Sequence, residues 1–344
     1  MSQYFALAIG CGTQNREDQW LEVYYPNPVL HPDAALISSI AEEVDYQGGN
    51  LAVEISHRQM SQIARHWRDA DFEHEASYAI ALQEAERPLV IVILATDAPA
   101  ASTPEAYLKL HLLSHRLVRP HGTNLSGIFS LLPNVAWTNE GAIDLDELPE
   151  RQLMARLNDS LLRVESVDKF PKMSDYIVPD GVRIADTARV RLGAYIGAGT
   201  TIMHEGFCNF NAGTEGPGMI EGRISAGVFV GKGSDIGGGA STMGTLSGGG
   251  NIVISLGEGC LLGANAGTGI PLGDRCTIES GLYITAGTKV ELLDDQGKAV
   301  DTVKARLLAG KPDLLFRRNS QNGRVECLTN RSAVELNDEL HKHN

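Results

Sequence analysis

Aliphatic residues recur every six positions in the second half of the chain, and this spacing limits the folds open to it. The first block spans Val178, Ile184, Val190, Ile196, Ile202 and Cys208, and the second spans Leu272, Ile278, Ile284 and Val290. A helix would place apolar residues three and four apart, and a sandwich strand would alternate every two. Six residues fit one flat strand plus a tight corner, so three units close one triangular coil. The spacing therefore predicts a parallel β-helix, without deciding its handedness.

Glycine usage supports this prediction. The chain has 37 glycines, concentrated after Gly181, and glycine relieves strain at tight corners. The repeat breaks at 214–219 and again at 242–251, where Ser-Gly-Gly-Gly-Asn is too glycine-rich to pack a core. We expect loops there, because long loops on a rigid scaffold are where function tends to lie. Tolerated insertions are the alternative.

The first half of the chain alternates strand and helix signals instead. The apolar run 89–95 is too short to cross a membrane and predicts a buried strand. Helices are expected over 30–44 and 73–86, and another from Ser102, where Ser-Thr-Pro-Glu resembles a capping box. The expected organisation is an α/β domain over 1–145, a helical linker over 146–177, a β-helix with inserted loops over 178–292, and a basic C-terminal segment and tail over 293–344.

The net charge and the cysteine content limit which partners the protein is expected to bind and in which cellular compartment it is expected to occur. A formal net charge of −14 argues against a nucleic-acid or membrane partner, because such surfaces need clustered cations. The five cysteines show no Cys-x-x-Cys pair and no zinc-ligand spacing, and no basic-then-apolar segment opens the chain. We therefore expect a cytoplasmic protein with small-molecule substrates.

Histidine usage separates the functions that a β-helix of this kind can host. Between Gly122 and Glu339 the only histidine is His204. A hexapeptide carbonic anhydrase needs three histidines to bind its zinc ion. A single copy of this chain cannot form such a zinc site unless histidines from the distant N-terminal half also bind the metal. An acyltransferase with a histidine general base would have to use His204. A histidine on the coil surface or between subunits is the alternative.

Six stretches of the second half resemble the tetrahydrodipicolinate N-succinyltransferases, in the longer form with an extended N-terminal domain. They are MHEGFCNFNAGT (203–214), IEGRIS (220–225), GGGAS (237–241), GGGN (248–251), LGANAG (262–267) and LFRRNS (315–320). The resemblance covers about 178–320. It implies a left-handed β-helix homotrimer with active sites between subunits. The implied reaction moves succinyl from succinyl-CoA to the amine of L-2-amino-6-oxoheptanedioate, in diaminopimelate and lysine biosynthesis.

The same resemblance assigns site residues. The family's catalytic glutamate, in Glu-Gly-Arg, falls on Glu221, either as general base or as acyl-anhydride nucleophile. A magnesium ion on the threefold axis would use Glu205; a second acidic family position falls near Ala188, with Asp186 the nearest acid, which departs from the family pattern. The succinyl-CoA site corresponds to Arg223, Gly238, Ser241, Ala264, Glu279, Ser280, Gly287, Lys304, Arg317, Arg318, Asn319 and Ser320.

The basic C-terminal segment points to an anionic ligand independently of the resemblance. Residues 298–324 hold seven Lys or Arg against two Asp, a local charge of +5 in a chain of −14. The three phosphates of CoA would use such cations. A solvated basic stretch is the alternative. Two other functions stay open from the residues: another hexapeptide N- or O-acetyltransferase using His204, and a non-catalytic β-helix scaffold.

Overall fold

The computed structural model describes residues 4–244 and 252–329, which fall into two compact units. The first unit lies within residues 1–117 and 122–171, and the second within 118–121 and 172–344. Most of the predicted loop at 242–251, including the GGGN motif, lies outside the described residues. None of the described helices has the length and apolar character needed to span a membrane.

The first unit is built on an antiparallel sheet in the order β2-β1-β5-β4, with β3 also paired to β1. Its strands are β1 (Ala6–Gln14), β2 (Trp20–Tyr24), β3 (Val29–Leu30), β4 (Leu51–Ile55) and β5 (Leu89–Leu94). The predicted strand at 89–95 is confirmed as β5, whose six residues are all buried. Such a continuous apolar run is typical of a strand covered on both faces.

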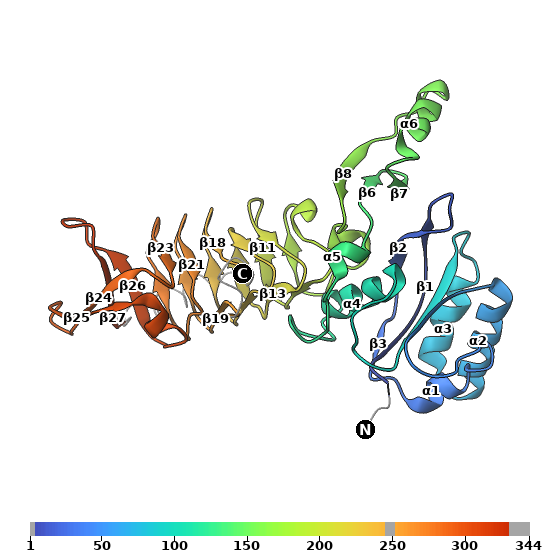
Figure 1. Ribbon diagram of the computed structural model, residues 1–344, viewed down its shortest axis with the longest axis horizontal. Coiled ribbons are helices and arrows are strands. Elements are labelled where there is room, and N and C mark those ends of the chain that lie inside the picture. Colours follow the sequence, from blue (N-terminus) through green and yellow to red (C-terminus); the bar gives the residue numbers. More distant parts are fainter. Residues whose placement is uncertain (1–3, 245–251, 330–344) are drawn as a thin grey trace. The chain divides into compact units, whose positions relative to one another are not determined.

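Helices provide that cover (Figure 1). The helices α1 (Ala34–Ser38), α2 (His57–Asp69) and α3 (Glu73–Leu82) share a core with alternate residues of β1 and β5. The buried helix α4 (Thr103–Ser114) packs against β2 and β5. Ser102 caps α4 as predicted, although the Glu105 carboxylate bonds the Ala101 N–H. The helix predicted over 30–44 ends at Ser38, where serine hydroxyls bond backbone carbonyls and compete with helical pairing.

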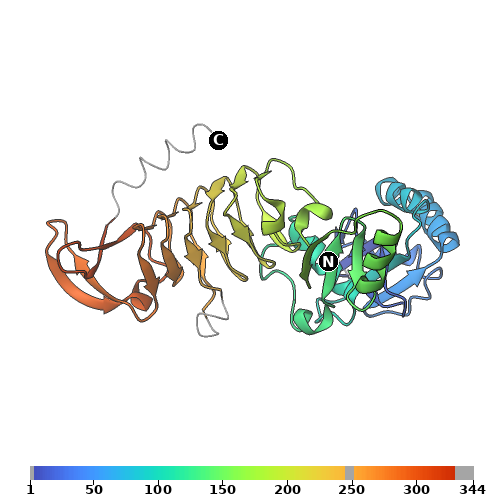
Figure 2. The same cartoon turned by 90° about the horizontal axis from the view of Figure 1, so that it is seen from above.

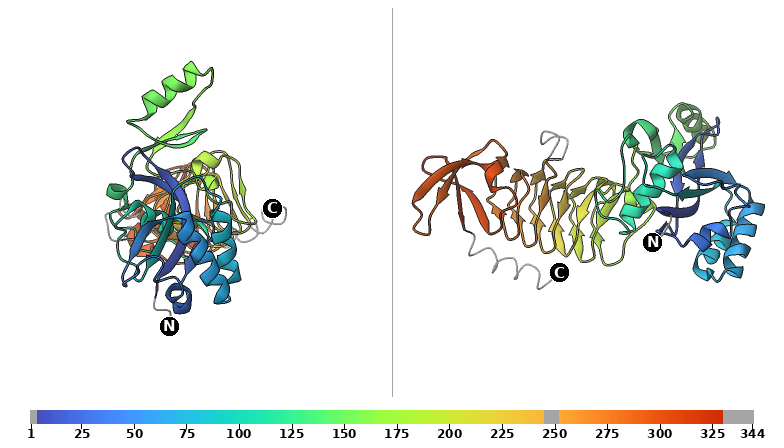
Figure 3. Two further views of the ribbon diagram at one scale, coloured as in Figure 1. Left: turned by 90° about the vertical axis from the view of Figure 1, so that its right-hand side faces the viewer. Right: turned by 60° about the horizontal axis from the view of Figure 1, so that its bottom comes forward.

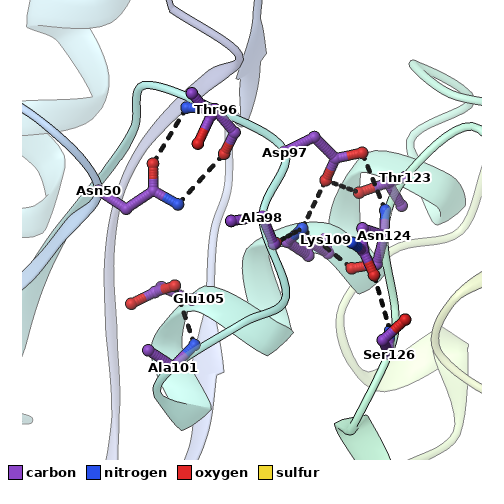
Figure 4. A network of polar contacts seen from close by, with 10 residues as sticks. All are labelled: Asn50, Thr96, Asp97, Ala98, Ala101, Glu105, Lys109, Thr123, Asn124 and Ser126. Carbon is purple, nitrogen blue, oxygen red and sulfur yellow. Dashed lines mark hydrogen bonds and ion pairs between the residues drawn. The ribbon is translucent and has the colours of Figure 1, made fainter.

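Lys109 of α4 is fully buried and carries a saturated polar network (Figure 4). Its Nζ donates to Asp97 Oδ1 at 2.5 Å and to the carbonyl oxygens of Ala98 and Asn124 at 2.6 and 2.9 Å. Asp97 also accepts from the Thr123 hydroxyl and the Asn124 N–H, both at 2.9 Å. Because all three ammonium hydrogens have acceptors, the buried charge is compensated.

A small sheet, β7-β6-β8, completes the first unit. It consists of β6 (Val135–Thr138), β7 (Gly141–Asp144) and β8 (Val164–Asp168), preceded by the short helix α5 (Ile128–Leu131). The expected helical linker over 146–177 contains the helix α6 (Leu148–Leu157), then β8 and the 3-10 helix η1 (Met173–Asp175), so only its first part is α-helical. Figure 3 shows α6 beside this sheet. None of the residues of α6 is buried.

The second unit is a parallel β-helix, as the spacing predicts (Figure 2). Its described strands stack in three parallel columns with the 3-10 helix η2 (Thr187–Arg189) near the start. The first column is β9 (Arg183–Ile184), β11 (Thr200–Ile202), β14 (Gly218–Ile220), β17 (Asp235–Ile236), β20 (Leu261–Leu262) and β22 (Thr277–Ile278). The second is β10 (Ala194–Ile196), β13 (Ala212–Thr214), β16 (Phe229–Val230) and β19 (Ser255–Leu256). The third is β12 (Phe207–Cys208), β15 (Arg223–Ile224), β18 (Ser241–Thr242), β21 (Gly267–Gly269) and β23 (Tyr283–Thr285).

The repeated aliphatic residues form the core of this prism. From Val190 to Cys208 and from Leu272 to Val290 every member of the repeat is buried. Ile184 is partly buried, and Val178 is 63% exposed, so its assignment to the core is wrong. Val178 precedes β9, the first paired strand, and has no described coil on which to stack.

One corner of the core carries hydrogen bonds that the aliphatic repeat does not predict. The Ser234 hydroxyl donates to the carbonyl oxygen of Gly257 on the next coil at 2.8 Å. The thiols of Cys260 and Cys276 occupy later coils and donate to Gly273 and Lys311 in the same way, at 3.1 and 3.2 Å. Small donor side chains thus provide hydrogen-bond partners for carbonyl groups at this corner of successive coils.

The C-terminal segment extends the first column. Strands β24 (Lys289–Leu293), β25 (Ala299–Lys304), β26 (Leu314–Arg318) and β27 (Val325–Thr329) form the order β25-β24-β27-β26, and β26 pairs with β22. The 3-10 helix η3 (Ala305–Leu308) connects β25 to the following turn. The predicted basic segment is therefore part of a sheet.

Candidate active site

The coil that carries Glu221 has a shortened corner. Between the first and third columns, four residues separate Ile202 from Phe207, and four separate Ile236 from Ser241. Only Glu221 and Gly222 separate Ile220 from Arg223. Both backbone N–H groups of this two-residue corner donate to the carbonyl of Ile236, at 2.8 and 3.1 Å. The corner is therefore two residues shorter than the corners before and after it.

The Glu221 side chain is half-buried and faces the glycine-rich corner of the next coil. A Cβ on Gly238 would lie 3.6 Å from Glu221 Oε2 and would meet no other heavy atom within 4 Å. No described residue makes a side-chain hydrogen bond or ion pair with Glu221. A carboxylate that is held by its backbone and lacks an internal partner is available to a ligand.

Several predicted site residues follow the first column of strands on successive coils. Register pairs Ile220 with Ile236, then Leu262, Ile278 and Phe316. One or two positions beyond these register partners lie Glu221, Gly238, Ala264, Glu279, Ser280, Arg317 and Arg318, of which the two arginines still belong to β26. Four strand spacings of about 4.8 Å place Glu221 about 19 Å from Arg317 along the coil stack.

Arg223 and Ser241 lie on the adjoining column. They are direct partners on β15 and β18, and the Arg223 Nε lies 3.4 Å from the Ser241 hydroxyl. Farther along this column the Tyr283 ring covers Gly267, where a Cβ would meet ring carbons at 2.2–2.6 Å. Gly287 and Lys304 lie beyond this column at another corner, and Lys304 is the cross-strand partner of Lys289. The structure thus does not bring these two to the Glu221 corner.

The basic residues at the end of the stack are held by carboxylates. Arg317 Nε donates to Glu326 Oε2 at 2.9 Å, and Asn319 Nδ2 donates to Glu326 Oε1 at 2.6 Å. The Arg318 N–H donates to Glu279 Oε2 at 2.7 Å. The Asn319 amide and then the Arg317 guanidinium lower the pKa of Glu326. Sequence reasoning missed Glu326, because only the β26–β27 pairing brings it opposite Arg317.

His204 and Glu205 occupy the corresponding corner one coil earlier, and both are exposed. The two candidate bases, His204 and Glu221, therefore lie at one corner on successive coils. The described residues contain no cluster of three His, Cys, Asp or Glu suited to a metal. One chain supplies a single carboxylate at Glu205, so it does not by itself form the predicted magnesium site.

A separate cavity of about 270 Å³ lies in the first unit. Trp20, Ser102, Leu131 and Asp144 are among its lining residues. No residue predicted for the site contributes to it.

Comparisons with known proteins agree with these features. Residues 132–172 match the model of the tetrahydrodipicolinate N-succinyltransferase middle domain, and residues 253–286 match that of the hexapeptide repeat of succinyl-transferase. The chain is 69% identical, over the full length of both chains, to a 2,3,4,5-tetrahydropyridine-2,6-dicarboxylate N-succinyltransferase from Pseudomonas paraeruginosa. A protein of the same name from Vibrio cholerae is 62% identical over 99% of each chain.

A solved structure extends the similarity to the fold. A Campylobacter jejuni protein described as a 2,3,4,5-tetrahydropyridine-2-carboxylate N-succinyltransferase superimposes with a TM-score of 0.88. It is 31% identical, and the match covers 97% of this chain and 94% of that one. The fold is an α/β N-terminal unit followed by a left-handed parallel β-helix, as expected. The chain belongs to the family of 2,3,4,5-tetrahydropyridine-2,6-dicarboxylate N-succinyltransferases.

Proposed function

We propose that the protein transfers the succinyl group of succinyl-CoA to the amine of ring-opened tetrahydrodipicolinate, L-2-amino-6-oxoheptanedioate. The reaction belongs to diaminopimelate and lysine biosynthesis. The observation that carries the proposal is the shortened corner that presents Glu221 beside Gly238. Identity of 62–69% to proteins named for this activity supports it.

The chemistry requires one proton acceptor near the thioester. The amine nitrogen attacks the thioester carbonyl carbon, an amide bond forms, the carbon–sulfur bond breaks, and CoA leaves as a thiolate that takes up a proton. Glu221 serves this reaction either by accepting the proton of the attacking ammonium or by forming an acyl anhydride that the amine then opens. In both roles the carboxylate must be free of internal partners, and its position in the shortened corner meets that requirement.

CoA lies along the coil stack in this proposal. Gly238 and Ala264 lack bulky side chains and allow an extended pantetheine arm to approach the backbone, with Ser241, Arg223, Glu279 and Ser280 beside it. Arg317, Arg318, Asn319 and Ser320 at the end of the stack, together with Lys304 and the Gly287 corner, bind the phosphates. Arginine suits phosphate because its planar fork donates two parallel hydrogen bonds.

The active unit in this proposal is a homotrimer with each site between neighbouring β-helices. Flat β-helix faces can enclose the thioester and exclude water without a large mobile lid. Three copies would also bring three Glu205 carboxylates to one axis, which is the arrangement that magnesium binding there requires. Metal analysis of the purified trimer tests whether this ion is present.

The decisive experiment compares Glu221→Gln with His204→Asn in an assay of CoA thiol release. Glu221→Gln should nearly abolish turnover while CoA affinity stays within a few-fold, because the amide keeps the side-chain shape but accepts no proton. His204→Asn should cost much less. An active Glu221 variant beside an inactive His204 variant would reverse the assigned roles and favour another hexapeptide acyltransferase. A wild-type protein that releases no CoA would instead indicate a binding scaffold.

The shared site has its own test. Glu221→Gln and Arg317→Ala subunits are mixed under conditions that allow exchange, and activity is measured before and after mixing. Recovery of activity is expected if the two residues serve one site from different chains. No recovery means that one chain supplies both, and full activity in a monomer contradicts the shared site altogether.

A further inference from the structure

Glu326 is a buried carboxylate whose two oxygens are both occupied by predicted CoA ligands. Its side chain is only 5% exposed, although it lies on the terminal strand β27. Oε2 accepts from Arg317 Nε and Oε1 from Asn319 Nδ2, at 2.9 and 2.6 Å. Burying a carboxylate is costly unless such bonds compensate it.

Arg317 pairs with Glu326 through Nε, which leaves the Nη edge of its guanidinium group available to a phosphate. Only Nε is engaged, and no other group in the described ranges pairs with this guanidinium, whose side chain is 45% exposed. An arginine fixed through Nε still presents two Nη groups. Those groups have the spacing that matches a phosphate bidentately. The contact with Glu326 therefore orients Arg317 without consuming its binding capacity.

Asn319 extends the same arrangement into the following turn. Its Oδ1 accepts the N–H groups of Gln321 and Asn322 at 2.9 and 3.3 Å, while its Nδ2 is held by Glu326. The turn after β26 is thus tied to the carboxylate through one side chain. Rotation of Asn319 would release both the turn and the second oxygen of Glu326.

We propose that Glu326 is a positioning residue for CoA, which holds Arg317 and the Asn319 turn so that the free Nη groups of Arg317 face a CoA phosphate. The inference rests on the proposed function, because Glu326 is assigned its role through Arg317 and Asn319, which that proposal places in the CoA site. Glu326 itself touches neither the thioester nor the acceptor amine in this arrangement.

The neighbouring strand offers a matched control. Glu291 on β24 is the direct register partner of Glu326. Its carboxylate also accepts from an arginine, Arg324 Nη1, at 2.8 Å, and its side chain is 15% exposed. Arg324 belongs to the basic stretch 298–324 but is not one of the residues that the resemblance assigns to the succinyl-CoA site. Glu291→Gln therefore removes the same kind of ion pair from the same sheet without touching Arg317 or Asn319.

The test measures steady-state kinetics of thiol release for Glu326→Gln and Glu291→Gln. Glutamine keeps the volume of Glu326 but turns one acceptor oxygen into a donor, so either Arg317 Nε or Asn319 Nδ2 loses its partner. We expect the KM for succinyl-CoA to rise about tenfold in Glu326→Gln, as losing a charge-assisted bond implies. Its kcat and its KM for the amine acceptor should stay within about twofold of wild type, and Glu291→Gln should match wild type in all three.

A double-variant cycle separates positioning from general loss of structure. If Glu326 acts through Arg317, adding Glu326→Gln to Arg317→Ala should raise the KM for succinyl-CoA little further. Fully additive effects, an unchanged KM in Glu326→Gln, or an equal rise in Glu291→Gln would overturn the inference. Should Glu326→Gln not fold, Arg317→Lys tests the same geometry, because an ammonium cannot both meet Glu326 and present a planar fork; an unchanged KM there counts against it.

The experiments distinguish failure of the proposed succinyl transfer from failure of the role inferred for Glu326. A wild-type protein that releases no thiol with the amine acceptor contradicts the succinyl transfer. Calorimetry with CoA alone still tests the inference in that case, since CoA should bind about tenfold more weakly to Glu326→Gln than to Glu291→Gln. Equal affinities of the two variants would overturn the role of Glu326 whatever the reaction.

Discussion

Two adjacent glycines at the corner above Glu221 should respond oppositely to alanine. A Cβ on Gly237 would lie 2.7 Å from the Leu262 oxygen and 2.8 Å from the Ala264 nitrogen, both backbone atoms of the next coil. Those atoms cannot move without separating the coils. A Cβ on Gly238 would meet only Glu221 Oε2, at the ordinary contact distance of 3.6 Å. Gly237→Ala should therefore damage the fold, and Gly238→Ala the site.

The magnitudes follow from these contacts. Overpacking against fixed atoms costs about 1–3 kcal/mol, so Gly237→Ala should lower the free energy of unfolding of the β-helix by at least that amount. Gly238 has no left-handed backbone angle, so alanine there should stabilise by about 0.4–1 kcal/mol through the unfolded chain. Its methyl group would nevertheless occupy the space beside the carboxylate. The proposed function gives this space to the pantetheine arm of CoA, and shifting the thioester by about 1 Å costs about a hundredfold, so kcat/KM in Gly238→Ala should fall ten- to hundredfold.

The chain provides an internal control for the stability assay. All three tryptophans, Trp20, Trp67 and Trp137, lie in the first unit. Urea unfolding followed by circular dichroism reports on both units, while tryptophan fluorescence reports on the first alone. Gly237→Ala should shift the dichroism transition and leave the fluorescence transition in place. A Gly238→Ala variant that loses as much stability as Gly237→Ala, or that keeps wild-type kcat/KM, contradicts these expectations.

Two further predictions concern the first unit, and both can be followed by tryptophan fluorescence. His111 is buried with Nε2 accepting the Tyr25 N–H, and burial lowers its pKa to about 3. Below pH 6.5 the unfolded chain protonates this histidine and the native chain does not, so His111 alone should lower the free energy of unfolding by about 1.4 kcal/mol per pH unit between pH 6.5 and 5. Burial also lowers the pKa of His115 to about 4, which adds a loss of the same sign. A flat profile over this range contradicts the prediction. Asp97→Ala leaves the buried Lys109 ammonium without its counter-charge and should cost about 3–5 kcal/mol. Adding Lys109→Met should restore part of this loss, and no recovery would show that the ion pair is not the cause.

The β-helix could be predicted from the sequence alone because the six-residue aliphatic repeat that indicates it is local and recurs on successive coils. Each coil meets the same geometric demand, so residues such as Ile196, Ile202 and Cys208 recur at a spacing that can be counted without knowing any contact. The buried strand β5 and the Ser102 cap were predictable for the same reason, since each depends on a few adjacent residues. The motif around Glu221 likewise identified the family before any geometry was known.

Tertiary structure decided what depends on pairing between distant segments. The shortened corner at Glu221 is defined only by the register of its coil against the coils on either side, which shows two residues missing there. Glu326 became significant only because antiparallel pairing sets it opposite Arg317 and buries it. Val178 fits the repeat in sequence yet is exposed, because an aliphatic residue joins a core only where a neighbouring coil covers it. Spacing along the chain determines which residues can point inward, and contacts between coils determine which of them are enclosed.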